Sequence, residues 1–369
     1  MSPSVPFALR RPFLITRDLL QSRADPDVAS LERIGDPEAF VWRILPHAAR
    51  TFAACITLLP AEFARASAVA YLYCRILDTY EDLIPAPAER ERTLAAFGGR
   101  FAVPDGRPPH PAPPIDGVHA RDQRDRAHVV LVNRCHLLDA VFRTLTPHVR
   151  EDIAELVQSM AEGMIWSSRA FAEQQGVLRD ADQLSRYCRC VIGLPFLFGV
   201  RLLHERRTGS STVPDALRED CLQAGEMVQL ANVTRDIEKD LRRGIAYHPA
   251  LAADLGRADV DDAALAGRIR RVREELLLRA LRLAPAYERM MAALPFRRVS
   301  LARASGVLML QFTDRYYRSC AARVGRRPWP GPRSTLSLIL RSAPHFVSAR
   351  WAARTVRGIT AAFVSSAGN

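Results

Sequence analysis

The chain has 369 residues, of which 48% are hydrophobic, and it carries a formal net charge of +12. That length can bury one large core or two ordinary ones, and the composition excludes global disorder. The positive charge comes from scattered arginines, and Lys239 is the only lysine, so the pattern does not indicate a nucleic-acid-binding protein. It is compatible with anionic substrates such as diphosphates, or with an anionic membrane surface.

Apolar residues recur at helical spacing through most of the chain, which predicts an all-α protein. In chain order, the pattern predicts helices near 36–46, 49–58, 61–83, 87–100, 127–145, 148–173, 181–206, 213–242, 258–293, 298–323 and 345–364. The Pro-rich stretch 103–123 is expected to form an extended, exposed loop. We expect an N-terminal extension at 1–35, a single domain at 36–324, and a linker with a C-terminal tail at 325–369.

The seven cysteines are an odd count without a CxxC pair. They predict buried, reduced thiols rather than disulfides or a zinc site. The N-terminus lacks the apolar core and small-residue cleavage site of a signal peptide. No apolar run reaches the roughly 18 residues of a spanning helix, because Arg201 interrupts the best candidate. We therefore expect a cytoplasmic protein.

The stretch YLYCRILDTYED ends by placing three carboxylates on an otherwise apolar helix. Tyr71, Arg75, Asp78 and Asp82 lie within roughly 60° of one another, at about 100° per residue. Glu81 lies beside them. A soluble protein does not normally place carboxylates there without a cation to meet them.

A second stretch, QLANVTRDIEKD, repeats the arrangement: Gln229, Asn232, Asp236 and Asp240 share one helical face. Mg²⁺ prefers oxygen ligands and is commonly bound by one or two carboxylates together with substrate phosphates. Two Asp pairs facing each other would therefore suit metal-assisted departure of a diphosphate. For either helix alone, a solvated, salt-bridged face is the better explanation. Two such helices favour the metal site.

The motifs ARTF, YLYCRILDTYED, MAEGM, RYCRCVIG and QLANVTRDIEKDLRRGIAYHP together resemble the squalene/phytoene synthase family, over roughly residues 40–320. The resemblance implies an all-α, isoprenoid-synthase-type single-domain bundle around a central cavity, with the two Asp helices facing each other at its mouth. It also implies Mg²⁺-dependent head-to-head condensation of two prenyl diphosphates through a cyclopropylcarbinyl diphosphate.

Carried over position by position, the resemblance implies three sets of residues. The expected magnesium ligands are Asp78, Glu81, Asp82, Asp236 and Asp240. The expected diphosphate-binding residues are Arg50, Arg75, Gln229, Asn232 and Arg235. The expected catalytic residues are Tyr71, Arg75 and Tyr187. Tyr187 would stabilise a carbocation or help move the proton lost on ring closure; an ordinary core tyrosine is the alternative interpretation.

The motifs divide between members of the family. DTYED resembles the squalene synthase form, whereas RDIEKDLRRGIAYHP resembles the phytoene synthase form, with Lys239 where an acidic residue is usual. Lys239 is expected to face solvent, roughly 60° off the metal-facing stripe. We expect a farnesyl diphosphate farnesyltransferase that makes squalene or a similar C30 product. The alternatives are a phytoene synthase acting on geranylgeranyl diphosphate and, from another class, an inactive homologue acting as a scaffold.

Squalene formation also needs a reductant, which is NADPH in known squalene synthases. The segment 296–310 resembles their cofactor region, and Arg297, Arg298 and Arg303 are the candidates. Ser300 and Ala302 stand where basic residues are usual, so the NADPH-dependent step stays open.

The C-terminal stretch HFVSARWAARTVRGITAAFVSS predicts an amphipathic helix. Its basic face carries Arg350, Arg354 and Arg357. Its apolar face, about 180° away, consists of Ala352, Val356, Ile359 and Phe363. Such a helix either lies peripherally in a bilayer interface or docks on the protein body.

Overall fold

The structure, a computed structural model, describes residues 7–20, 25–49, 51–102, 110–256, 263–332 and 334–368. No strand forms among these residues, and Val177 pairs with Ala246 in an isolated parallel bridge. The prediction of an all-α protein is confirmed.

The chain divides into two compact units, residues 1–165 and 166–369. The first unit contains α1 (Phe7–Leu20), α2 (Val28–Glu32), α3 (Pro37–Ala49), α4 (Thr51–Leu58), α5 (Ala61–Leu83), α6 (Pro87–Gly99), α7 (Gln123–Asn133) and α8 (Cys135–Phe142). The helix α9 (Pro147–Glu173) contains the boundary. The second unit contains α10 (Ala181–Cys188), η2 (Arg189–Gly193), α11 (Leu194–Thr208), α12 (Asp215–Arg242), η3 (Pro249–Asp254), α13 (Ala263–Arg282), α14 (Ala284–Ala293), α15 (Leu301–Arg323), α16 (Thr335–Val347) and α17 (Ala349–Gly368).

The Asp-bearing helix α5 is the central helix of the first unit and contacts α3, α4, α6, α7 and α8. It has the bounds that the sequence predicts, beginning after Pro60 and ending before the extended Ile84. Behind the Asp-bearing face, the buried Tyr73 hydroxyl donates to Asp139 Oδ1 at 2.8 Å. Arg100 donates to the other oxygen of Asp139 at 2.6 Å. This buried network fixes α5 within its unit, because each charged group is paired.

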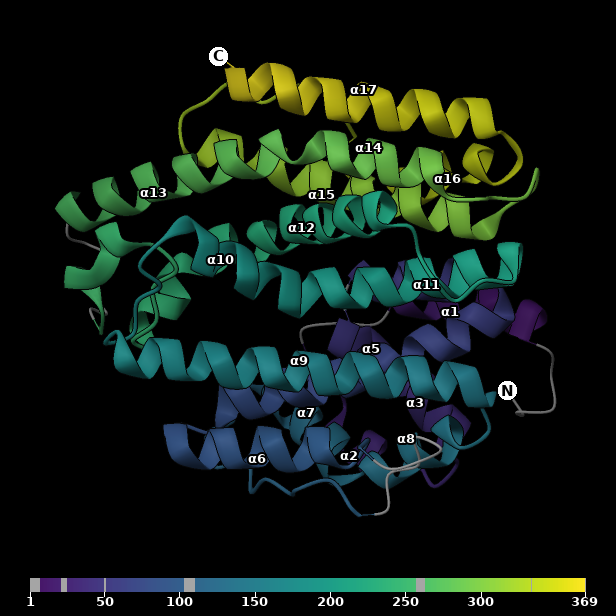
Figure 1. Ribbon diagram of the computed structural model, residues 1–369, viewed down its shortest axis with the longest axis horizontal. Helices are drawn as coiled ribbons and strands as arrows, with labels where there is room; N and C mark the ends of the chain where they lie inside the picture. Colours follow the sequence, from purple (N-terminus) through teal and green to yellow (C-terminus); the bar gives the residue numbers. More distant parts are fainter. Residues whose placement is uncertain are drawn as a thin grey trace. The chain divides into compact units, whose positions relative to one another are not determined.

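The second Asp-bearing helix, α12, lies between α10 and α11 on one side and α13 and α14 on the other (Figure 1). It begins after Pro214 and ends at Arg242, two residues before Gly244, whose φ of +74° favours glycine. The helix predicted at 181–206 is one continuous rod, but residues 189–193 form a π-helical turn just before Pro195.

Three predicted helices are interrupted, and the one predicted at 345–364 is divided at Ser348 between α16 and α17. The helix predicted at 127–145 is divided at Arg134 into α7 and α8. The helix predicted at 258–293 is divided at Leu283, directly before Ala284 and Pro285, into α13 and α14. A proline at the start of α14 cannot donate the hydrogen bond that would continue α13.

The N-terminal extension contains a helix: Arg11 of α1 donates to the carbonyls of Thr57 and Leu59 at 3.1 and 2.7 Å. Within the Pro-rich stretch, residues 103–109 lie outside the described residues, and 110–122 are non-helical. The Tyr80 hydroxyl donates to the Pro113 carbonyl at 2.6 Å and ties this segment to α5.

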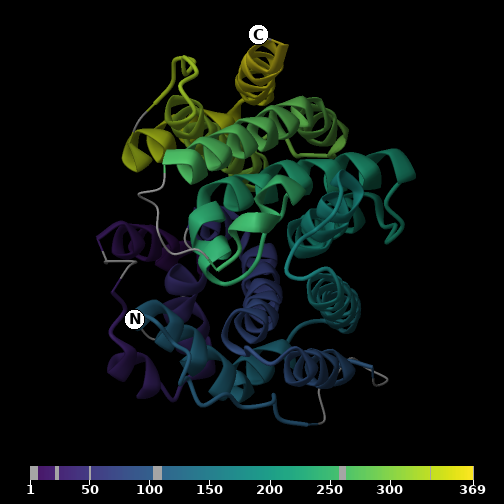
Figure 2. The same ribbon diagram turned by 90° about the vertical axis from the view of Figure 1, so that its left-hand side faces the viewer.

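The C-terminal tail packs on its own unit. Figures 1 and 2 show α17 at the outer edge of the second unit, along α13 and α14, which it contacts. Ala352, Val356 and Phe363 on its apolar face are buried, whereas Arg350 and Arg354 are exposed. The structure thus has the docked form of the amphipathic helix.

All seven cysteines are buried and free, as predicted. Among the described residues, one helical stretch, Ala181–Thr208, has the length and apolar composition that could cross a membrane. In its most apolar window, 56% of the residues are buried inside the protein. Buried core helices commonly pass the same test, so this finding is weak evidence for a membrane span.

Candidate functional site: two aspartate-bearing half-sites

The first half-site is the polar face of α5. Arg75 forms an ion pair with Asp78 at 3.2 Å and donates to the Tyr71 hydroxyl at 2.9 Å. Its guanidinium carbon lies 5.7 Å from the centre of the Tyr71 ring, a cation–π contact. The third nitrogen of Arg75, Nε, is buried without a hydrogen-bond partner in the described chain. Arg75 is thus held at the face by two neighbours and keeps a donor for a further acceptor.

The surroundings of Asp78 in this half-site disfavour its charged form. Burial and the nearby charge of Asp82 raise the pKa of Asp78 to about 6, although Arg75 opposes the rise. Asp82 and Glu81 are half-buried on the same helix. A cation bound here would relieve the repulsion between the carboxylates.

A histidine that the sequence analysis did not single out is close to this half-site. His128 of α7 is 7% exposed, and its Nε2 is buried without a hydrogen-bond partner in the described chain. Burial and the positive charges of Arg75 and Arg124 lower the pKa of His128 to about 3. No motif marked His128, because its proximity to α5 arises only when α7 packs on that helix.

The second half-site is the polar face of α12. Asn232 donates to the Gln229 side-chain oxygen at 2.8 Å, and Gln229 is 6% exposed. Arg235 binds Asp236 with two parallel hydrogen bonds of 2.9 and 2.7 Å. Burial by itself would lower the pKa of Arg235, but these hydrogen bonds to Asp236 raise it. Every predicted residue of this stripe therefore lies on one partly buried face.

The stripe ends at Asp240, which is 8% exposed and lies 3.7 Å from Arg243. Lys239 is exposed, which confirms that it faces solvent. Next to the stripe, the hydroxyl groups of Thr234 and Tyr316 lie 3.0 Å apart. Sequence alone gave no signal for Tyr316, which comes from α15, about 80 residues later in the chain.

The predicted catalytic tyrosine has an aromatic partner. Tyr187 is 6% exposed and accepts a 3.0 Å hydrogen bond from the Tyr247 hydroxyl. The two ring centres are 5.0 Å apart, and Phe171 meets Tyr247 edge-on at 5.6 Å. The sequence offered a signal for Tyr247. This residue belongs to the segment GIAYHP, which follows Asp236 in the second aspartate motif.

The two half-sites fit magnesium by their chemistry. Among the described residues, no group of three or more His, Cys, Asp or Glu side chains could hold a metal ion by itself. Each half-site instead offers an aspartate pair with spacing i, i+4 and an arginine beside it. That donor set suits ions that are shared between one or two carboxylates and substrate phosphates. Arg50, which was predicted to bind diphosphate, lies outside the described residues.

The three arginines predicted to bind NADPH differ in exposure. Arg297 and Arg298 are exposed. Arg303 is 4% exposed, and its guanidinium donates to the carbonyls of Arg297, Arg298, His345 and Phe346 at 2.8–2.9 Å. In this structure Arg303 joins the start of α15 to the end of α16, so the side chains that reach solvent are Arg297 and Arg298.

Comparisons with known proteins agree with the family resemblance of the motifs. The model of the squalene/phytoene synthase family matches residues 45–333. Squalene synthase from Eremothecium gossypii is 28% identical over 215 residues, 56% of this chain and 45% of that protein. Phytoene synthase from Rhodobacter capsulatus is 26% identical over 238 residues, 63% of this chain and 59% of that protein. The chain thus spans about half the length of these curated relatives.

Among solved structures, TcSQS in complex with the ligand BPH1237 is similar, with a TM-score of 0.62 and 17% sequence identity. The match covers 90% of this chain and 98% of TcSQS. At that identity the likeness concerns the fold, and it confirms the predicted isoprenoid-synthase-type bundle.

Proposed function

This chain belongs to the squalene/phytoene synthase family, and on that basis we propose that it condenses two farnesyl diphosphates head to head, through presqualene diphosphate, to squalene or a similar C30 product. Enzymes of the family are prenyltransferases that use prenyl diphosphates and are generally Mg²⁺-dependent. The observation that carries the proposal is the pair of polar stripes, each with two aspartates and an arginine bound to one of them.

In this proposal the residues divide the work by charge. Asp78, Asp82, Asp236 and Asp240 would hold magnesium, with Glu81 assisting. Bound magnesium would supply positive charge to the departing diphosphate. Arg75 and Arg235 already lie against the aspartates, where guanidinium groups can also bind phosphate oxygens in bidentate fashion.

After diphosphate departs, the allylic cation is attacked by the double bond of the second substrate, and loss of a proton closes the cyclopropane. The cyclopropane intermediate then loses the second diphosphate, and the resulting cation rearranges its ring. The final cation is quenched by hydride or by proton loss. We assign stabilisation of the cation and movement of the proton to Tyr187. Its ring face offers negative potential to a cation. Its hydroxyl already accepts a hydrogen bond from Tyr247, so its own proton is directed elsewhere.

The test is a product assay with purified protein, Mg²⁺ and farnesyl diphosphate, with and without NADPH. Squalene formed only with NADPH would support the complete reaction and give Arg297 and Arg298 a role in binding the cofactor. Presqualene diphosphate or dehydrosqualene formed regardless of NADPH would mean that the reductive step is absent. Asp78→Ala and Asp236→Ala are the controls, because each should abolish turnover and leave the helical circular dichroism intact.

A phytoene synthase acting on geranylgeranyl diphosphate is the second candidate. The match to a phytoene synthase covers a larger share of both chains than the match to the Eremothecium gossypii squalene synthase, at nearly equal identity. Product from geranylgeranyl but not farnesyl diphosphate would favour it. Absence of product from both would favour an inactive homologue with a scaffold role, although both intact aspartate pairs argue against that class.

Membrane contact through the tail is part of the proposal. Since the apolar face of α17 is packed inside its unit, contact would use exposed side chains of α16 and of the start of α17. Leu340 and Val347 of α16 and Trp351 of α17 are 64, 57 and 54% exposed, and Arg350 and Arg354 beside Trp351 are also exposed. Aromatic, aliphatic and basic side chains together suit an anionic bilayer interface.

Flotation with vesicles tests this contact. Binding to vesicles with phosphatidylserine, weakened by Trp351→Ala and absent with neutral vesicles, is the expected result. Equal flotation of the wild type and the variant would contradict the proposed contact.

A further inference from the structure

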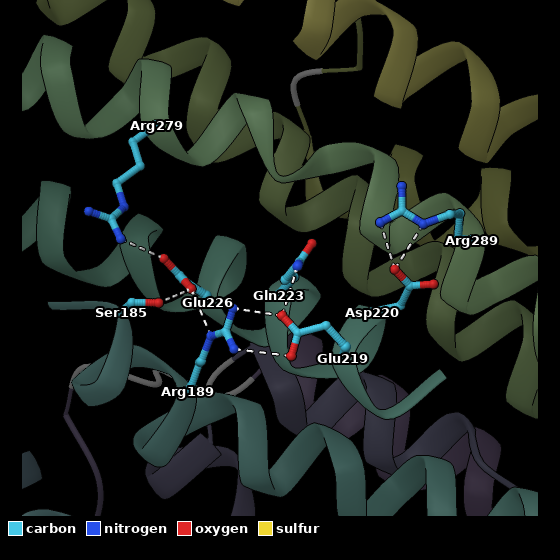
Figure 3. A network of polar contacts seen from close by, with 8 residues as sticks. All are labelled: Ser185, Arg189, Glu219, Asp220, Gln223, Glu226, Arg279 and Arg289. Atoms are coloured by element: carbon cyan, nitrogen blue, oxygen red, sulfur yellow. Dashed lines mark hydrogen bonds and ion pairs between the residues drawn. The ribbon is translucent and has the colours of Figure 1, made fainter. Parts of the chain in front are cut away.

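The buried carboxylate of Glu226 is not used in the proposed chemistry. It lies on α12 one turn before Gln229, and it is 2% exposed. It accepts hydrogen bonds from Ser185 at 2.5 Å, Arg189 at 3.2 Å and Arg279 at 2.9 Å (Figure 3). A buried charge is costly unless it is paired and hydrogen-bonded, and here two arginines and a hydroxyl satisfy it.

These donors hold α10 near both of its ends. Ser185 and Arg189 come from α10 and the adjoining π turn, and Arg279 comes from α13. Arg279 also donates to the carbonyl of Ala181, the first residue of α10, at 2.8 Å. Glu226 is therefore the common point at which α10, α12 and α13 are joined.

The face of α10 that carries these donors determines where Tyr187 lies. Ser185 and Arg189 are four residues apart and share one face of the helix, which points to α12. Tyr187 lies two residues from each, so it is about 160° away around the helix. There it contacts Tyr247. If α10 rotated about its axis, Ser185 and Arg189 would move away from Glu226. The same rotation would move Tyr187 away from Tyr247.

An independent contact holds the same segment close to α12. Gly225, next to Glu226, meets Gly193 of the π turn backbone to backbone. A Cβ on Gly225 would lie 2.5 Å from the Gly193 Cα. π-helical turns are rare and occur frequently at functional sites. The segment that carries Tyr187 is thus fixed in distance by Gly225 and in rotation by Glu226.

We propose that Glu226 is a positioning residue that sets the rotation of α10 and thereby directs Tyr187 to the reacting carbons. This role rests on the proposed function, in which Tyr187 faces the substrate. It predicts a loss in the chemical step rather than in substrate binding, because the arginines and aspartates that would hold the diphosphates are not part of this network.

The experiment compares Glu226→Gln with Glu226→Asp and with the control Glu219→Gln, in the full chain. Glu219 is the second carboxylate bound to Arg189, at 2.9 Å, but its side chain is 48% exposed. For each variant, kcat and KM are measured with farnesyl diphosphate and Mg²⁺. Nitration of Tyr187 by tetranitromethane, mapped by mass spectrometry, reports its exposure without reference to activity.

We expect Glu226→Gln to lower kcat about tenfold or more, to change KM less than threefold, and to make Tyr187 reactive. Glu226→Asp should recover part of kcat, and Glu219→Gln should behave like the wild type. If Glu226→Gln does not fold, Ser185→Ala removes one donor without changing charge and should lower kcat about threefold or more.

A normal kcat per folded molecule with a protected Tyr187 in Glu226→Gln would overturn the role, even if the melting temperature fell. If the wild type turns over neither farnesyl nor geranylgeranyl diphosphate, the proposed function fails. In that case the nitration of Tyr187 alone decides whether Glu226 positions it.

Discussion

Asp78 and Asp236 are matched in sequence pattern but differ in their surroundings. Asp78 is bound by one nitrogen of Arg75, its side chain is 19% exposed, and burial raises its pKa to about 6. Asp236 is bound by two nitrogens of Arg235, and its side chain is 32% exposed. In the proposed enzyme both carboxylates are needed in the ionised state, so a cation should matter more for Asp78.

Replacing either aspartate with asparagine should therefore remove charge that no neighbour can supply. For Asp78→Asn and Asp236→Asn we expect turnover to fall about a hundredfold or more, since a lost metal ligand costs several kcal/mol of transition-state stabilisation. Steady-state assays over a range of Mg²⁺ concentrations measure this. Lys239→Ala, which changes the charge of the same helix at an exposed position, should stay within about threefold of the wild type. Retained turnover in Asp236→Asn would contradict the metal assignment.

His128 gives a prediction for pH. Burial, Arg75 and Arg124 lower its pKa to about 3 from 6.5, so the folded protein keeps it neutral while the unfolded chain takes up a proton. The unfolded state therefore binds more protons between these values, and the free energy of unfolding falls as pH falls below about 6.5.

His128→Gln should reduce that fall. Between about pH 6.5 and about pH 4.5, we expect the variant to lose about 2 kcal/mol less than the wild type. Urea unfolding at several pH values, followed by circular dichroism, measures the difference. The exposed His136→Gln in α8 is the control and should follow the wild-type curve. Parallel curves for His128→Gln and the wild type would show that His128 titrates normally.

At the scale of elements, the contact between α12 and the π turn is the most demanding. Gly225→Ala would place a methyl group 2.5 Å from the Gly193 Cα, and backbone cannot move aside as a flexible side chain can. We expect a loss of about 1–3 kcal/mol in the free energy of unfolding, the usual cost of overpacking. Gly199→Ala, in open space on α11, should be neutral or stabilising by about 0.5–1 kcal/mol. Equal stability of the two variants in denaturant titrations would show that the helices separate easily.

Some features of the fold and of the candidate site could be predicted from the sequence alone. The bounds of α5 could be predicted because Pro60 and Pro85 frame an alanine-rich, periodic stretch. The two stripes could be predicted because spacing along one helix depends only on its pitch.

The π turn, the breaks at Arg134 and Leu283, and the Glu226 network could not be predicted in this way. Each depends on which helix packs against which, and pairs such as Glu226 and Arg279 lie 53 residues apart. For the same reason the internal use of Arg303 was missed: its partners His345 and Phe346 belong to the tail.

At the scale of the whole molecule, the C-terminal tail adds buried contacts to its unit. Phe363 is fully buried, with ring centres 5.3 Å from Trp329 and 5.8 Å from Tyr317. The Thr360 hydroxyl donates to Glu288 of α14 at 2.7 Å, and Arg326 donates to the carbonyl of Ser366 at 2.9 Å. These contacts make α17 part of the core of its unit.

A docked helix and a helix that leaves the body for a bilayer predict opposite results for Phe363→Ala. If α17 stays docked, losing this ring should cost about 3–5 kcal/mol, as for other large buried side chains. Trp351→Ala, at an exposed position of the same helix, should change stability by no more than about 0.5 kcal/mol. Urea titration without and with anionic vesicles measures both. A Phe363→Ala variant as stable as Trp351→Ala would mean that α17 is undocked in solution, and its apolar face would then be the one free to enter a membrane.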